Sequence, residues 1–480
     1  MSFLYLSVSG QTKALTPIQS KHVASVNEVP GELIMHGIPV PVLSFAGSMK
    51  AWRAQGLQSC IAPTHSSRVL YAVPSIQDLF TSLSTDGDAI KIHSVEIHDV
   101  ETAKQKPARA LKHLLKLNHV NYSILYHNDR FHNHMPHLLS SAYLFGSDAT
   151  HLSRLYEMEE KVLEPWRDSP EEIAVDDWRE YLGKPEYQRA YLDFFEDELV
   201  HHSYDWRKVV EMYLYSGGRP LINNVVAGLG HPLIHLGYAY EMSSRDVAIE
   251  SLAMTATCYN YLHKYIDDHS YLETPPTYQT SSSLEILHKI RTDKRFDNLF
   301  EEPGGDNLEI VFKDHEDAIL EHWRAWAITP DPVKQLEVSQ KDAAAIFVAA
   351  DTEKHDFFLV HLLTTSHAIR ILLPFVPSRF HVSLVRQWWL IVVGVYVAQL
   401  RPKIEPDAIR YYDVKGRNWD WIGGQAINGK WAEETHFIKA LRALKEAAKT
   451  WGDSDEYYIK AAVKLVDDFK GFGGFGEQAA

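Results

Sequence analysis

Apolar side chains recur every three to four residues along most of the chain after about residue 103. This spacing is the period of an amphipathic α-helix, whose apolar stripe faces a core. It predicts helices over 108–117, 136–145, 153–163, 186–198, 206–215, 243–265, 282–292, 307–327, 339–348, 351–373, 377–399, 432–450 and 454–469. Clusters of Pro and Gly at 274–277, 302–306 and 329–332 predict loops between them. The pattern therefore indicates a mostly α fold.

The first hundred residues have a different pattern. Ranges 32–45 and 89–97 are rich in Val and Ile and alternate apolar with polar positions, which is typical of short β-strands. We expect a small mixed α/β N-terminal region over 1–102 and a large helical domain over 103–470. The Gly-rich end, 471–480, is expected to be a flexible tail.

The most apolar run, 388–398, has eleven residues, well short of the roughly 20 that span a bilayer, so we expect a buried helix and no membrane span. The net charge of −15 argues against a nucleic-acid partner. Only Cys60 and Cys258 are present, without CxxC spacing, which suits a reducing compartment. The N-terminus has no signal-peptide pattern, and we expect a cytoplasmic protein of undetermined oligomeric state.

Histidine is abundant, with 26 in 480 residues, and many lie next to apolar residues on predicted helices. His134 and His137 are three residues apart, and His231 and His235 are four apart, so each pair shares a helix face. Imidazole can bind a metal, move a proton or bond a phenol. The alternative is that these rings cap helices or are satisfied core histidines. A zincin-type protease is not supported, because Pro232 stands where its glutamate would follow His231.

Lys354 precedes His361 by seven residues, which is two turns of the helix predicted there. The two side chains would then share a face, and Lys354 is expected to be buried beside His361. A buried lysine would be neutral, paired, or converted by carbon dioxide to a carbamate that offers an oxygen ligand. The alternative is a lysine whose ammonium reaches the surface.

Motifs for nucleotides and nucleophiles are missing from the sequence. It has no G-x-G-x-x-G after a predicted strand, no P-loop and no G-x-S-x-G elbow. A built-in flavin or nicotinamide fold is therefore not expected. Oxidation chemistry would have to draw on a metal and dioxygen, or on the substrate itself.

Four short segments resemble the questin oxidase-like family. They are FHNHMPHLL at 131–139, GLGHPLI at 228–234, KHDFFLVH at 354–361 and ETHFIK at 434–439. The resemblance runs from about residue 114 to about residue 445, and its four motifs occur in the family's order. It implies an O2-using oxidoreductase, a Baeyer–Villiger-type oxidase that cleaves a ring of a hydroxyanthraquinone-like aromatic polyketide in secondary metabolism.

The resemblance also implies the site residues, namely His134, His231, His361 and His436, with Lys354 beside them. They are expected to converge, either as ligands of a non-haem Fe(II) or as a site without metal that acts on an electron-rich phenolate. NADPH accompanies such oxidations, but no binding motif for it is present. Two rival functions stay open: a metal-dependent hydrolase with a His/Lys cluster, and a non-catalytic helical protein that binds aromatic ligands.

Overall fold

The structure is a computed structural model that describes residues 90–476. Its helices are α1 (Lys106–Asn121), α2 (Met135–Leu144), α3 (Ala149–Glu159), α4 (Gln188–His201), α5 (Trp206–Leu214), α6 (His231–Met242), α7 (Arg245–Thr257), α8 (Lys264–Asp267), α9 (Ser270–Glu273), α10 (Ser283–Thr292), α11 (Asn307–Asp314), α12 (Glu316–Arg324), α13 (Pro332–Val348), α14 (Phe357–Leu372), α15 (His381–Ala398), α16 (Asp407–Arg410), α17 (Trp419–Asn428), α18 (Thr435–Trp451) and α19 (Tyr457–Asp468). The strands are β1 (Leu125–Tyr126), β2 (Phe131–His132), β3 (His355–Asp356) and β4 (Phe472–Gly473). The predicted mostly α fold is confirmed.

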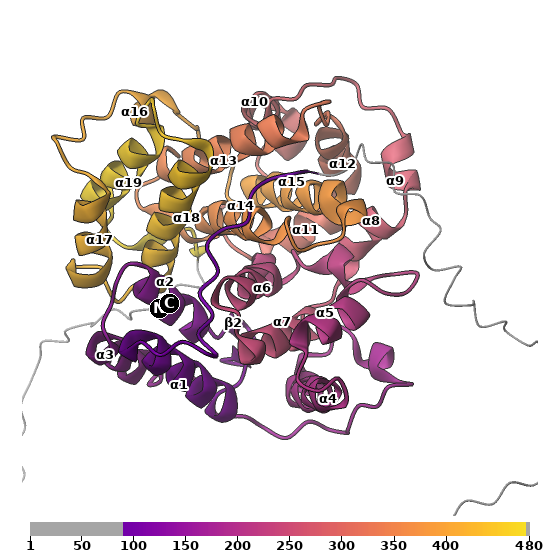
Figure 1. The fold of residues 1–480 in the computed structure, drawn as a ribbon. Helices are drawn as coiled ribbons and strands as arrows, with labels where there is room; N and C mark the ends of the chain where they lie inside the picture. Colours follow the sequence, from indigo (N-terminus) through magenta and orange to yellow (C-terminus); the bar gives the residue numbers. More distant parts are fainter. Residues whose placement is uncertain (1–89, 477–480) are drawn as a thin grey trace, which may run out of the picture. The chain divides into compact units, whose positions relative to one another are not determined.

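The centre of the helical part is built from α6, α7 and α14. Helix α6 packs against α7 and α14, and α14 packs in turn against α13, α15 and α18. Helices from the two ends of the described chain also meet: α2 packs against α18 (Figure 1). One stretch, Ser378–Ala398, is long and apolar enough to cross a membrane, yet 83% of its apolar window is buried inside the structure. It packs as a core helix, as expected for 388–398.

The predicted strand over 89–97 is not formed in its described part, residues 90–97. The side chains of Ile90 and Val95 are buried, but no strand among the described residues pairs with the backbone there. Instead, the backbone N–H of Ile90 donates to Nδ1 of His381 at 2.9 Å. The range 32–45 lies outside the described residues, and the boundary predicted at residue 102 stays a prediction.

Several predicted helices are shorter than their apolar patterns. The helix predicted over 351–373 begins only at Phe357, because the Asp356 carboxylate caps it by accepting from the backbone N–H groups of Phe358 and Leu359. The range 307–327 breaks into α11 and α12 at His315. Helix α7 ends at Thr257, and the rest of the range 243–265 holds a short 3-10 turn and the first residues of α8.

Two short strand pairs flank the helices. Strands β1 and β2 form an antiparallel hairpin just before α2, and β3 pairs in parallel with β4 just before α14. The second pair lies partly in the range 471–480, whose flexibility stays a prediction. Residues 472–473 form strand β4, which pairs with β3. The described residues 471–476 around it are partly buried.

Candidate functional site

Four histidines from four different elements meet inside the helical core. His134 immediately precedes the first turn of α2, His231 begins α6, His361 lies in α14, and His436 lies in the first turn of α18. One ring nitrogen from each lies within 4.8 Å of the others, and all four side chains are buried. The predicted convergence of these four residues is therefore confirmed. We call this group the histidine cluster.

The backbone before α2 holds His134 in place through its neighbour Asn133. The Asn133 amide donates to Oδ1 of Asn118 at 2.8 Å and to the carbonyl of Ser123 at 3.1 Å. Its oxygen accepts from the backbone N–H of Met135 at 3.0 Å. The Asn-His pair thus anchors the β1–β2 hairpin to α1 and delivers the imidazole to the start of α2.

His231 is placed by a left-handed turn, η5 (Gly228–Gly230), whose three residues all have positive φ. At Gly230 (φ 76°) an added Cβ would lie 2.5 Å from the Thr365 hydroxyl of α14, so only glycine allows this approach. Nδ1 of His231 donates to the carbonyl of Gly228 at 2.6 Å. The turn therefore positions both the start of α6 and the orientation of the imidazole.

The outward nitrogens of three cluster rings have acceptors, which leaves their Nε2 atoms for a ligand. Besides His231, Nδ1 of His361 donates to the carbonyl of Phe357 at 2.8 Å, and Nδ1 of His436 to the Glu434 carboxylate at 3.4 Å. Such contacts orient metal-binding imidazoles in proteins. Nε2 of His361 and Nε2 of His436 are buried without a hydrogen-bond partner among the described residues.

Burial makes the cluster electrically neutral. The pKa of each of its four histidines lies well below 6.5, first because burial disfavours the charged imidazolium and then because neighbouring cationic groups repel it. Neutral imidazole is the form that binds metal ions and accepts protons. The cluster is therefore in its ligand-competent form at neutral pH.

The spacing of the cluster suits one metal ion. Nε2 of His134 and Nε2 of His231 are 2.9 Å apart. Two nitrogens about 2.1 Å from one ion lie about 3.0 Å apart at right angles and about 4.2 Å apart when opposite. The largest separation, 4.8 Å, is only slightly wider. A small rotation of the side chains would bring four imidazoles to a single ion, which fits iron, copper, nickel or zinc.

Lys354 does not join the cluster, and its predicted burial is wrong. Its side chain is exposed, because the capped helix starts at Phe357 and residues 351–354 lie outside it. The buried lysine is Lys439 of α18, one turn after His436 and only 1% exposed. Its Nζ has no hydrogen-bond partner among the described residues, and burial lowers its pKa to about 7. The final motif, ETHFIK, contains this lysine. Its i, i+3 spacing from His436 was the sequence feature that could have indicated that the two side chains share a helix face.

Further polar side chains surround the cluster. His132 stacks on His231, with ring centroids 3.9 Å apart, and the His137 ring lies edge-on to His134. His235 is fully buried and bonded to Glu250 of α7. From the sequence, His137 and His235 were expected to share helix faces with His134 and His231, whereas Glu250 was not predicted. A single acid within the apolar run 247–256 was the signal that pointed to it.

Aromatic rings close one side of the cluster. Phe357 lies 4.9 Å from His361 and 4.6 Å from His436, measured between ring centroids. From the C-terminal segment, Phe475 packs on Phe357 at 4.8 Å and Phe472 reaches His436 at 5.8 Å. The segment expected to be flexible thus supplies part of the apolar wall.

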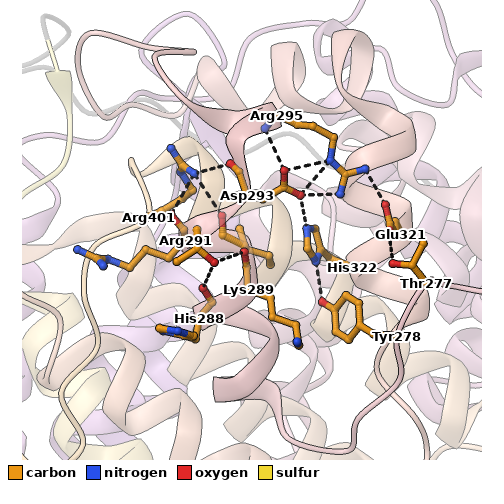
Figure 2. Close-up of polar contacts among 12 residues, drawn as sticks. Thr277, Tyr278, His288, Lys289, Arg291, Asp293, Arg295, Glu321, His322 and Arg401 are labelled. Atoms are coloured by element: carbon orange, nitrogen blue, oxygen red, sulfur yellow. Dashed lines mark hydrogen bonds and ion pairs between the residues drawn. The ribbon is translucent and has the colours of Figure 1, made fainter.

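Not every buried histidine belongs to this site. His322 of α12 lies in a separate polar network, where it accepts from the Tyr278 hydroxyl at 2.6 Å and donates to Asp293 at 2.9 Å (Figure 2). Arg295 pairs with Asp293 and Glu321 in the same network. These contacts join the loop after α10 to α12, and a structural role explains them.

Comparison with known proteins places these residues in context. A family model described as questin oxidase-like matches residues 131–444, a range that includes the whole cluster and Lys439. The chain is 24% identical over 368 residues to Baeyer-Villiger oxidase ptaJ of Pestalotiopsis fici, covering 70% of this chain and 80% of that protein. It is 25% identical over 369 residues to a questin oxidase of Aspergillus fumigatus, with the same coverage. With Baeyer-Villiger oxidase mdpL of Emericella nidulans it shares 22% identity over 414 residues, covering 78% and 91%.

Proposed function

Because this chain belongs to the questin oxidase-like family, we propose that it is a Baeyer–Villiger-type oxidoreductase that uses dioxygen to cleave a ring of a hydroxyanthraquinone-like polyketide. The names of its relatives, questin oxidase and Baeyer-Villiger oxidase, support the reaction class. The observation that carries the proposal is the buried, neutral histidine cluster, in which the Nε2 atoms of His361 and His436 lack a partner.

We propose that His134, His231, His361 and His436 hold a non-haem iron. When bound, such an ion would bind and reduce dioxygen, a reaction that organic molecules without a metal undergo only slowly. The alternative, a site without metal, would rely on oxidation of an electron-rich phenolate. The N–H contacts from three of the rings to backbone and carboxylate oxygens support the metal reading, because they point one nitrogen of each ring inward.

Lys439 takes the role that the sequence analysis gave to Lys354. Its Nζ is buried beside a neutral cluster and its pKa is lowered to about 7, so much of it is an amine near neutral pH. An amine can add carbon dioxide, forming a carbamate and releasing a proton. Lys439 would then supply an anionic oxygen that the four imidazoles lack.

The other groups of the site would bind the flat substrate and exclude water. Phe357 and Phe472 offer apolar rings beside His361 and His436, suited to a tricyclic aromatic ligand. Neutral imidazoles accept hydrogen bonds from phenolic hydroxyls. NADPH stays a proposal without a recognised motif, and the electrons for a monooxygenase reaction would come from it or from the substrate.

The test combines elemental analysis of freshly purified protein with oxygen uptake on hydroxyanthraquinones. We expect iron near one equivalent per chain and turnover that requires oxygen. Isotope-labelled dioxygen should enter the product, one atom for a monooxygenase and two for a dioxygenase. Equal turnover without oxygen, together with bound zinc, would favour the hydrolase. Absence of turnover by folded, metal-loaded protein with every phenolic tricycle would favour the binding protein.

A further inference from the structure

A continuous line of hydrogen-bonded side chains leads from His137, which lies beside the histidine cluster, to the protein surface. Nε2 of His137 lies 3.1 Å from Nδ1 of His235, and Nε2 of His235 lies 2.8 Å from the Glu250 carboxylate. The other oxygen of Glu250 lies 2.9 Å from Nδ1 of His119, and Nε2 of His119 lies 2.8 Å from Glu196. Helices α2, α6, α7, α1 and α4 each contribute one member.

The side chains of this line are buried at its inner end and exposed at its outer end. Glu250 is 2% exposed and His235 is fully buried, whereas the Glu196 side chain is 43% exposed. A buried carboxylate is costly unless donors satisfy both of its oxygens. Glu250 has one imidazole on each oxygen, so the two histidines satisfy it and it orders them in return.

The partners determine where each proton lies. His119 has a carboxylate at each nitrogen and therefore donates from both. Burial alone would lower its pKa, but the hydrogen bonds to Glu196 and Glu250 outweigh burial and raise the pKa to about 10. Burial would likewise raise the pKa of Glu250, yet the hydrogen bonds from His119 and His235 lower it, so the group is a carboxylate. Asp246, nearby on α7, adds negative charge that favours the imidazolium.

The ionised Glu250 sets the tautomers of the next two rings. Since a carboxylate only accepts, His235 must donate to it from Nε2, and when that ring carries a single N–H its Nδ1 is an acceptor. His137 then donates from Nε2 to that nitrogen. Its own Nδ1 must carry a free lone pair, and that atom is buried without a partner among the described residues.

His137 stands at the inner end of the line, next to the cluster. It follows His134 by one helical turn, and the two ring centroids are 5.4 Å apart. Its other neighbours include Tyr238, whose hydroxyl already bonds to Ser141 at 2.6 Å. A buried lone pair at this place lacks only a donor, and a phenolic hydroxyl of a ligand is one.

We propose that Glu250 is a positioning residue: acting through His235, it holds His137 in the tautomer whose Nδ1 accepts a hydrogen bond from a hydroxyl of the bound aromatic substrate. This inference rests on the proposed function for the identity of the ligand. On this proposal Glu250, which does not touch the substrate, makes the site prefer a free hydroxyl over a methylated one. A methyl ether offers no proton and leaves the lone pair of His137 unpaired.

The first experiment reads the tautomers directly in metal-free protein. Nitrogen–proton correlation spectra of 15N-histidine-labelled protein distinguish bare from protonated ring nitrogens, and a His137→Gln variant assigns the ring. We expect a bare Nδ1 at His137 in the wild type. In Glu250→Met, which removes the acceptor for His235, both tautomers of His137 should appear. A single bare Nδ1 in folded Glu250→Met would overturn the positioning role.

The second experiment measures equilibrium binding of a hydroxyanthraquinone and of its O-methyl ether under anaerobic conditions. The wild type should prefer the free hydroxyl by about tenfold, the ratio expected from one buried hydrogen bond. In Glu250→Met this ratio should fall at least about threefold, because a ring free to change tautomer can also donate to the ether oxygen. An unchanged ratio would overturn the inference.

Controls separate this role from the general cost of losing a buried acid. Glu198→Met removes another buried carboxylate with two donors, His201 and Tyr213, and should change neither the spectrum of His137 nor the ligand preference. If Glu250→Met does not fold, Glu250→Gln replaces it: its amide oxygen accepts from Nδ1 of His119, which leaves its NH2 to face His235. The appearance of a second tautomer there would support the inference, and a single unchanged one would overturn it.

The two proposals fail in different ways. If neither anthraquinone binds to the wild type, the proposed function and the hydroxyl contact both fail, while the spectra still decide whether Glu250 sets the tautomer. If both compounds bind and turn over, but the preference for the free hydroxyl is the same in wild type and Glu250→Met, the proposed function stands and this inference fails.

Discussion

The imidazoles of the cluster are useful because they are buried and therefore uncharged. Their pKa values lie well below 6.5, and their inward nitrogens are free to bind. We predict that His361→Gln and His436→Gln each lower turnover at least about 100-fold, the typical contribution of a positioned catalytic group. Both should also lower the iron content measured by elemental analysis. Full turnover of either variant would contradict the assignment.

A matched control for this prediction is His322→Gln, which removes an equally buried histidine from the separate network around Asp293. It should lower stability without changing the iron content. Lys354→Met, at an exposed position, should change neither.

Lys439 should make stability depend on alkaline pH. Its pKa is about 7 in the folded protein and 10.5 in the reference state, so the unfolded chain binds more protons between those values. The burial cost is then fully present below pH 7 and is relieved as pH rises toward 10.5. Lys439→Met should therefore stabilise metal-free protein by a few kcal/mol below pH 7, and the gain should vanish near pH 10.5. Urea unfolding in carbonate-free buffer checks this, and a gain that does not vary with pH would contradict it.

The parts of the site that could be predicted from the sequence are those whose residues lie in short motifs. Each histidine of the cluster stood in a short motif, so all four could be named from the sequence. Lys354 was placed wrongly because the two-turn argument needs an unbroken helix, and the Asp356 cap starts that helix later. Glu250 was missed because its role depends on His119 and His235, which approach it only in the folded chain.

Among the structural elements, the turn before α6 is under the tightest constraint. Gly230→Ala would add a Cβ 2.5 Å from the Thr365 hydroxyl at a φ of 76°. We predict a loss of at least about 2 kcal/mol in unfolding free energy, from strain of about 1–2 kcal/mol plus the clash. Displacement of His231 should lower metal affinity as well.

Gly416→Ala isolates the strain, since Gly416 has a similar φ of 73° and open space around its Cβ. It should cost only the strain and leave metal binding unchanged. Chemical denaturation and metal titration of both variants test this, and equal effects on metal affinity would contradict the positioning of His231 by the turn.

The C-terminal segment should act as a cover for the site. We predict that a chain ending at Lys470 keeps its metal but turns over at least about tenfold more slowly, because water reaches Phe357 and His436 once Phe472 and Phe475 are gone. Gly474→Ala should act in the same direction, since its Cβ would clash with the Asp356 carboxylate. Unchanged turnover with both variants would show that the segment packs against the site without protecting it from water.

Most helix positions were predicted from apolar spacing, but α17, the helix ends and the strands were not. The period marks which face is buried, whereas caps such as Asp356 and breaks such as His315 depend on single residues. The strand pair β3–β4 joins residues more than a hundred positions apart. Alternation of apolar residues over 89–97 predicted a strand, yet within residues 90–476 no strand pairs with it, and the ring of His381 accepts the hydrogen bond of the Ile90 N–H.

For the folded protein taken together, the buried histidines predict sensitivity to acid. Below pH 6.5 the unfolded chain protonates imidazoles that the fold keeps neutral, so stability falls as pH decreases. Each such histidine contributes up to about 1.4 kcal/mol per pH unit. Urea midpoints of metal-free protein should therefore drop steeply between about pH 7 and pH 5, and less steeply in His436→Gln. An equal slope in both proteins would contradict the neutral assignment.

The wide separation of the cluster residues also has a consequence for how the protein is made. His134 and His436 are 302 positions apart (436 minus 134), so at about 5–20 residues per second the ribosome adds the last of them roughly 15–60 s after the first. A nascent chain during that interval has α2 and α6 without the partner helix α18 that covers them. An ion could be captured only weakly before translation is nearly finished, and a cell that makes this protein must keep the unfinished chain from aggregating until its final helices arrive.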